Sequence, residues 1–264
     1  MRSLLGTHDL LFVTLDTLRF DVAAERLAAG RTPNLAKVLP GGVWERRHTP
    51  ASFTYAAHHA FFGGFLPTPV TPGPHERPFA ARFAGSTSVG ADTWVFDAPD
   101  VVTGLRDEGY HTVCLGGVGF FAMTSLQGCV LPDLFDEAHW TPEFGVTSPG
   151  CFEAQIATLA RVLPPAGPLF TFVNVAALHQ PNRHYLPGAA EDSMASHGAA
   201  LEYVDRHLPE LLRLATSRGR PCHVILCSDH GTAYGEEGHT GHRLAHEVVW
   251  TVPYAEFTLE AGSW

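Results

Sequence analysis

Short apolar runs alternate along the chain with longer amphipathic segments. Four runs have strand length and are rich in Val, Leu and Phe: 10–15, 111–115, 169–175 and 224–227. Continuous apolar runs are typical of parallel strands that are buried on both faces. Helix-length segments, several of them closed by Gly or Pro, occupy 20–29, 34–39, 54–62, 98–108, 152–163 and 193–217. The alternation predicts an α/β fold, a three-layer sandwich with a mostly parallel central sheet.

The remaining segments fit one domain over residues 1–264. The run 252–257 is interpreted as the last strand, and only about ten residues follow it. The stretch 67–94 is rich in Pro and Gly without a clear period, which favours a long surface excursion or small hairpin over a domain boundary. No internal repeat is present. A chain of 264 residues, 45% of them hydrophobic, buries enough surface to fold without a structural metal or disulfides.

Charge and cysteine content exclude several classes of function. The 17 Lys and Arg residues against 27 Asp and Glu give a net charge of -10, and no basic run is present, so we expect no nucleic-acid partner. Five cysteines without a CxxC pair indicate buried, reduced thiols. The apolar N-terminal stretch is too short to span a membrane and has no cleavage site. These features predict a cytoplasmic protein without a membrane partner.

Polar residues follow the predicted strands at the point where each strand ends. Asp16 ends the first run, His179 lies beyond the run 169–175, and Asp229 and His230 end the run 224–227. Carboxyl ends of parallel strands meet at one edge of a sheet, which is where ligands bind in such folds. The 16 histidines of the chain also motivate a search for a metal or acid/base cluster.

A hydroxyl group completes this set of candidate residues. Thr54 lies at the expected start of a helix. Together with Asp16, Asp229 and His230 it provides two carboxylates, an imidazole and an alcohol, which suit Zn or Mn. Coordination to a dication stabilises a threonine alkoxide, and a helix N-terminus favours negative charge near it. Thr54 is therefore a candidate nucleophile toward phosphorus or sulfur.

Each of these residues also has a structural explanation. Asp16 fits a turn and Thr54 fits a helix cap. Glu236 and Glu237 fit a solvated face. Four further histidines are interpreted as surface or core residues: His58, His59, His184 and His246. The functional interpretation depends on the joint occurrence of the candidates at strand ends.

The order of the motifs resembles the alkaline phosphatase superfamily, in particular its sulfatase-like and its phosphoethanolamine or phosphoglycerol transferase-like branches. The matching segments are Thr-Pro-Asn-Leu at 32–35, the nucleophile segment at 49–67, Leu-Arg-Asp-Glu-Gly-Tyr-His-Thr at 105–112, the late helix at 201–205 and Ser-Asp-His-Gly at 228–231. Together they run through most of the chain.

This resemblance implies an alkaline phosphatase-like fold and a role for each site residue. Asp16, Thr54, Asp229 and His230 fall where family members bind one divalent metal, with Thr54 at the nucleophile position. The resemblance places further histidines where relatives bind the charged group of the substrate, protonate the leaving group or hold a second metal: His179, His242 and, less securely, His239. It therefore implies one or two ions.

The departures from the family pattern narrow the function. Thr54 and His58 stand where formylglycine sulfatases need a modifiable Cys or Ser and an Arg. Thr17 replaces a second acidic residue, which weakens a Ca site. Asn174 precedes His179, where bimetallic relatives have an Asp, so the number of metals stays open. The chain is also short, and we expect a minimal domain without the C-terminal subdomain that many relatives fold over the site.

We therefore expect a metal-dependent enzyme that hydrolyses a phosphomonoester or phosphodiester through a phosphothreonine. The alternatives are a phosphotransferase with the same intermediate, a sulfatase-like hydrolase, and a non-catalytic metal-binding protein of the same fold. The substrate is expected to be a small-molecule or peptide-borne phosphate ester. Without the C-terminal subdomain, the site is either open or closed by a partner or a second copy of the chain.

Overall fold

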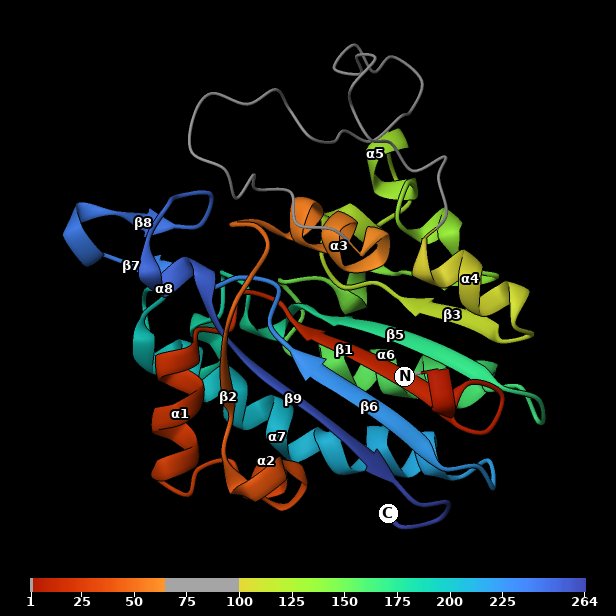
Figure 1. Ribbon diagram of the computed structural model, residues 1–264. Helices are drawn as coiled ribbons and strands as arrows, with labels where there is room; N and C mark the ends of the chain where they lie inside the picture. Colours follow the sequence, from red (N-terminus) through yellow and green to blue (C-terminus); the bar gives the residue numbers. More distant parts are fainter. Residues whose placement is uncertain (1, 65–99) are drawn as a thin grey trace, which may run out of the picture.

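A central sheet of seven strands in the order β2-β9-β6-β1-β5-β3-β4 organises the computed structural model, which describes residues 2–64 and 100–264 (Figure 1). The strands are β1 (Asp9–Leu15), β2 (Glu45–His48), β3 (His111–Leu115), β4 (Glu137–His139), β5 (Leu169–Val175), β6 (Cys222–Cys227) and β9 (Thr251–Leu259). Strand β1 pairs in parallel with both β5 and β6, whereas β9 is antiparallel to β6 and β2. The short strands β7 (Ala233–Tyr234) and β8 (Thr240–Gly241) pair with each other outside this sheet.

Helices cover both faces of the sheet. On one face lie α1 (Phe20–Ala28), α2 (Pro33–Val38), α6 (Cys151–Val162) and α7 (Met194–Thr216); on the other lie α3 (Thr54–Gly63) and α4 (Val101–Asp107) (Figure 1). Two single-turn helices, α5 (Leu126–Cys129) and α8 (Glu247–Trp250), lie in connections. Short 3-10 turns lie at Arg2–Leu4, Pro40–Gly42, Gly119–Phe121, Pro132–Leu134, Pro142–Phe144, Ala176–Leu178, Arg183–Tyr185 and Glu236–Gly238.

This arrangement confirms the predicted three-layer fold with a mostly parallel sheet, with small differences. The helix expected over 98–108 begins at Val101, because the Asp100 side chain accepts hydrogen bonds from the amides of Val102 and Thr103. The exposed strand β2 was not predicted, since its four residues are all polar. The predicted excursion 67–94 lies outside the described residues. The five cysteines are free, and all except Cys129 are buried.

Two hydrophobic cores lie on the two faces of the sheet, because successive side chains of a strand point to opposite faces. Leu11 and Val13 of β1 join the core shared with α6 and α7, whereas Leu10 and Phe12 face the core under α3 and α4. No helix in the described part of the chain combines the length and apolar character needed to cross a bilayer.

Aromatic rings under α3 fix the helix that carries Thr54. The buried ring of His58 lies among Phe61, Phe121 and Phe172, with ring centroids 5.1 to 5.5 Å apart. Its Nδ1 is 2.7 Å from the Thr54 carbonyl oxygen, to which it must donate, so Nε2 is left to accept from the Thr14 hydroxyl at 3.0 Å. His58 is therefore a core histidine, as its structural interpretation expected, and it ties the first turn of α3 to β1.

Replacing Phe172 should test this core. The ring is fully buried and contacts several aromatic neighbours, so Phe172→Ala should lower the free energy of unfolding by about 3–5 kcal/mol. Urea unfolding followed by circular dichroism measures the change. The exposed Val43→Ala serves as control and should change stability by less than about 0.5 kcal/mol. A loss for Phe172→Ala as small as that of the control would contradict this account.

Candidate active site

Two carboxylates converge at the carboxyl edge of the sheet. Asp16 directly follows β1 and Asp229 follows β6, and since these strands are parallel neighbours the two side chains meet. Both are 0% exposed. Oδ1 of Asp229 accepts hydrogen bonds from the amides of Thr17 at 3.1 Å and His230 at 3.0 Å. The oxygens left without a hydrogen-bond partner are Oδ1 of Asp16 and Oδ2 of Asp229.

Burial controls the charge of this pair. It raises the pKa of Asp16 to about 6, with the neighbouring Asp229 charge acting in the same direction, and raises the pKa of Asp229 to about 7. Two buried carboxylates with unpartnered oxygens are costly unless a cation compensates them. One atom of each carboxyl group and a ring nitrogen of His230 lie within 4.8 Å of one another. This set of oxygen and nitrogen donors fits a divalent transition metal.

The main chain around His230 orients its imidazole. Nδ1 lies 2.9 Å from the Gly231 carbonyl oxygen, which can only accept, so Nδ1 carries the proton and Nε2 keeps its lone pair for a metal. Gly231 is required here, because a Cβ atom would lie 1.9 Å from the carbonyl oxygen of Val248. Thr49 donates its hydroxyl to the Asp229 carbonyl oxygen and so supports the same turn.

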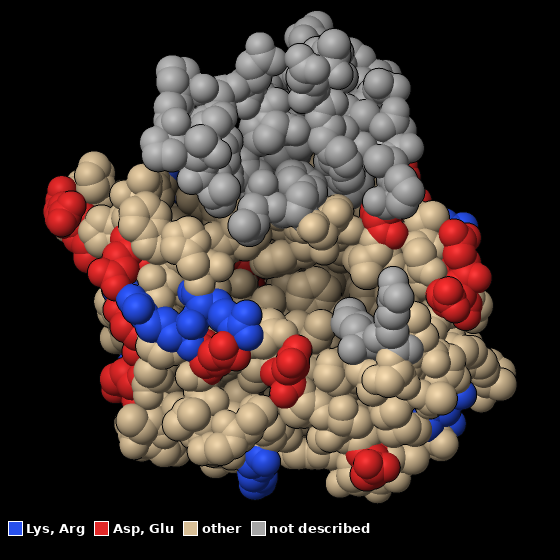
Figure 2. All heavy atoms as spheres, in the orientation of Figure 1, with Lys and Arg blue, Asp and Glu red and all other residues tan. Residues whose placement is uncertain are grey.

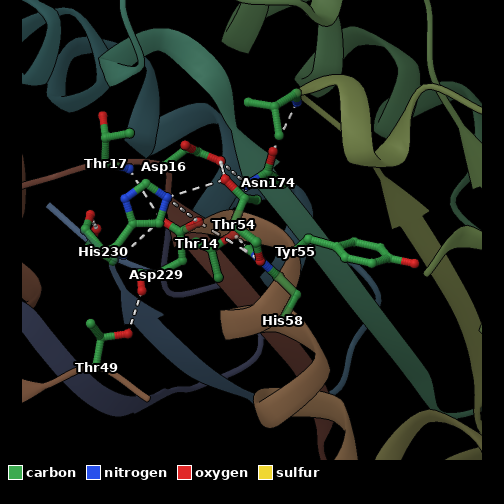
Figure 3. A network of polar contacts seen from close by, with 12 residues as sticks. Thr14, Asp16, Thr17, Thr49, Thr54, Tyr55, His58, Asn174, Asp229 and His230 are labelled. Atoms are coloured by element: carbon green, nitrogen blue, oxygen red, sulfur yellow. Dashed lines mark hydrogen bonds and ion pairs between the residues drawn. The ribbon is translucent and has the colours of Figure 1, made fainter. Parts of the chain in front are cut away.

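Thr54 completes the group that the sequence predicted. Its side chain is buried at the first residue of α3, with Oγ1 3.2 Å from His230 Nε2 and 3.4 Å from Asp16 Oδ2 (Figure 3). The structure therefore brings together the four residues that were expected to bind one metal. The N-terminus of this ten-residue helix also favours an anion beside Thr54.

Two further residues, whose positioning roles the sequence did not show, hold the two carboxylates. Asn174 donates through Nδ2 to Asp16 Oδ2 at 3.0 Å, and its Oδ1 accepts from the Val118 amide at 3.0 Å. Thr17 has a φ of 65°, a strained value for a β-branched residue. Its hydroxyl donates to the Leu178 carbonyl oxygen at 3.1 Å while its amide binds Asp229. For Asn174, the sequence did contain a signal of this role, because it is a polar residue inside an otherwise apolar strand.

Two of the three additional candidate histidines lie beside Thr54. His179 and His242 line the same pocket as Thr54, and their ring centroids are 5.5 Å apart. The His242 ring is 4.7 Å from that of His230, and burial lowers the pKa of His242 to about 3. His239 is exposed and does not line this pocket, so its site role stays a prediction.

The interpretation of Glu236 and Glu237 as a solvated face holds for Glu237, but Glu236 is only 28% exposed. The Glu236 carboxylate pairs with the guanidinium of Arg19, which is only 3% exposed and also binds Asp21 at 2.6 Å. Arg19 further donates to the Thr232 carbonyl oxygen at 3.3 Å. A buried guanidinium needs such partners, and the sequence did not show which acidic residue would fold onto it. The pairing anchors the segment that follows His230.

The fold is similar to those of several solved structures. The soluble domain of lipooligosaccharide phosphoethanolamine transferase A from Neisseria meningitidis matches with a TM-score of 0.65 and 14% identity, over 97% of this chain and 78% of that one. The C-terminal periplasmic domain of EcEptC from Escherichia coli, in complex with Zn, gives 0.62 and 12%, over 97% and 74%. An alkaline phosphatase superfamily protein from Vibrio parahaemolyticus gives 0.57 and 12%, over 98% and 62%.

The chain has the alkaline phosphatase-like fold. This confirms the fold expected from the order of the sequence motifs. No protein-family model matches the sequence, and no curated protein is similar to it in sequence. The predicted cytoplasmic location is wrong: similar domains from E. coli and Campylobacter jejuni are periplasmic, and a short N-terminal apolar stretch was too weak a basis for that prediction.

Asp229→Asn should reveal the cost of the buried charge. The folded-state pKa of about 7 lies above the unfolded value of about 3.9, so the stability contribution of Asp229 is present below pH 4 and lost as the pH rises through 7. In metal-free protein, the free energy of unfolding of the variant should therefore rise relative to that of the wild type as the pH increases from about 5 to about 8. The expected relative gain over this range is about 1–3 kcal/mol. Denaturant unfolding with a chelator measures this difference.

Zinc should stabilise the wild type much more than Asp229→Asn. It should raise the melting temperature of the wild type and change that of Asp229→Asn far less, because the variant loses a charged ligand. The exposed Asp107→Asn serves as the matched control and should respond to zinc as the wild type does. A stability difference between Asp229→Asn and wild type that does not change with pH would contradict the account.

Proposed function

We propose that this protein is a metal-dependent enzyme that cleaves phosphate esters through a Thr54 nucleophile. The observation that carries this proposal is the position of Thr54 Oγ1, 3.2 Å from His230 Nε2 and 3.4 Å from Asp16 Oδ2, at the start of a helix. A protein that only stored an ion would not need a buried hydroxyl there. The same observation argues against the non-catalytic alternative.

Asp16, Asp229 and His230 would hold the ion, with Thr54 Oγ1 beside them. A bound dication lowers the pKa of a coordinated hydroxyl and stabilises charge on a phosphoryl group. Thr54 would lose its proton to solvent, and its oxygen would form a bond to phosphorus as the bond to the leaving oxygen breaks. Asn174 and the amides of Thr17 and His230 keep the two carboxylates in place during this step.

His179 is the proposed proton donor to the leaving oxygen. It lines the pocket with Thr54, and its Nδ1 donates to the Gln180 carbonyl oxygen at 2.5 Å, so the protonated imidazolium would hold its second proton on Nε2 and give that proton to the leaving oxygen. His242 has a lowered pKa and is neutral near pH 7, so it suits a hydrogen-bonding role. A second metal, which the sequence left open, would need these same histidines.

The phosphothreonine can be resolved by water or by an acceptor alcohol. Hydrolysis is the reaction predicted from the sequence, and transfer is a second candidate because two of the similar structures are domains of phosphoethanolamine transferases. Zinc is favoured over manganese by the Zn-bound E. coli structure. Thr54 does not support the sulfatase-like alternative, because formylglycine is formed from Cys or Ser and not from Thr. The periplasmic relatives favour a location outside the cytoplasm.

Thr54→Ala should abolish turnover. Loss of the nucleophile should lower kcat on para-nitrophenyl phosphate esters by about 10⁴-fold or more, while zinc affinity changes by less than about tenfold, since three ligands remain. Stopped assays and zinc titration measure the two quantities separately. Thr54→Ser keeps a hydroxyl and should retain part of the activity. Turnover near the wild-type rate in Thr54→Ala would refute the nucleophile.

The loss of activity in His179→Gln should depend on the leaving group. An alkoxide needs a proton as it departs and para-nitrophenolate does not, so the variant should lose about 10²-fold on an alkyl ester and far less on a para-nitrophenyl ester. The measurement is kcat/KM on the two ester types. The matched variant His242→Gln should reduce both rates to a similar extent. Equal losses on both ester types for His179→Gln would exclude it as the acid.

A further inference from the structure

The pocket in front of Thr54 has two chemically different walls. Its volume is about 360 Å³. One wall holds the reactive groups, with Thr54, His179, His242 and Arg243. The other wall is neutral and comes from the segment 118–128, which leads into α5, and from Val146. A phosphate that reacts at Thr54 would extend its remaining ester arm toward this second wall.

The described residues that line this pocket carry formal charge of one sign. Among the described residues that line it, Arg243 carries a formal positive charge and none carries a carboxylate. Asp16 and Asp229 lie behind Thr54 and are committed to the metal group. A cationic arm would therefore enter a pocket that already holds a guanidinium, without a carboxylate on these walls to pair with it.

Arg243 is held close to the nucleophile segment. Its backbone has a φ of 70°, an uncommon value for a residue other than glycine, and its amide donates to the Ser52 carbonyl oxygen at 2.8 Å. The guanidinium lies over the Phe53 ring, 5.8 Å from its centroid. Both contacts are with the two residues that precede Thr54, so the positive charge stays beside the reacting phosphate.

The opposite wall offers neutral hydrogen-bonding groups. The Ser125 oxygen accepts from the Gly128 amide at 3.1 Å, which leaves the hydroxyl proton to donate to a ligand. The Gln127 side chain is exposed and supplies an amide with both donors and an acceptor. Groups of this kind bind alcohols well, whereas an ammonium group in a charged pocket needs a carboxylate partner.

We propose that Gln127 and Arg243 determine specificity, so that the pocket accepts a phosphate ester whose retained arm is uncharged and hydroxylated, and disfavours an arm that carries an ammonium group. This substrate class rests on the proposed function. It separates this chain from the phosphoethanolamine transferases that share its fold.

Two diesters with the same para-nitrophenyl leaving group test the preference, one with a glycerol arm and the other with an ethanolamine arm. In each, the Thr54 oxygen bonds to phosphorus, para-nitrophenolate leaves, and water then releases the phosphate with its arm. Because the leaving group is shared, the comparison reports on the arm. The zinc-loaded wild type should show a kcat/KM about tenfold or more higher for the glycerol ester.

A single carboxylate should reverse this preference. Gln127→Glu keeps the size of the side chain and should raise kcat/KM for the ethanolamine ester by about tenfold, while that for the glycerol ester falls. The matched control is Leu126→Glu, which adds the same charge one residue away. Leu126 is 57% exposed and does not line the pocket, so this variant should keep the wild-type preference.

The outcomes distinguish a failure of the specificity proposal from a failure of the proposed function. Turnover of both esters by the wild type without a preference for glycerol would overturn the specificity proposal alone. An equal shift in Gln127→Glu and Leu126→Glu would also overturn it, since the position of the charge would then be irrelevant. Failure to turn over either ester would instead refute the proposed function.

Discussion

The site depends on two buried carboxylates that the sheet forces together. Asp16 and Asp229 follow parallel neighbouring strands, so the fold itself places two carboxyl groups side by side where neither is exposed to solvent. Their raised pKa values and unpartnered oxygens show that protein groups alone do not compensate this charge. In the function proposed above, a divalent cation would compensate this charge, and the same cation would make the neighbouring Thr54 hydroxyl a useful nucleophile.

The surrounding residues serve to hold this group in one arrangement. Asn174 fixes one carboxylate, the strained Thr17 backbone fixes the other, and Gly231 lets the chain turn tightly enough to orient His230. The aromatic core under α3 acts through His58, which holds the Thr54 carbonyl oxygen. Packing in this core therefore sets the position of the Thr54 hydroxyl.

The sequence allowed the fold, and the meeting of Asp16 with Asp229, to be predicted because both depend on local pattern. Apolar runs marked the parallel strands, and the polar residues after them marked the edge where Asp16 and Asp229 meet. The pairing of Arg19 with Glu236 could not be predicted, because neither residue ends an apolar run and no local pattern showed which charges would meet. The role of Asn174 was missed because it lies inside an apolar run and not at its end.

The central claim is that Thr54 carries the phosphoryl group between the two half-reactions. The most direct measurement is mass spectrometry of the zinc-loaded protein, quenched with acid during turnover of an aryl phosphate ester and digested to peptides. The account predicts one added phosphoryl group on the peptide that contains Thr54, assigned to that residue by fragmentation. Phosphorylation of a different residue during turnover would contradict it.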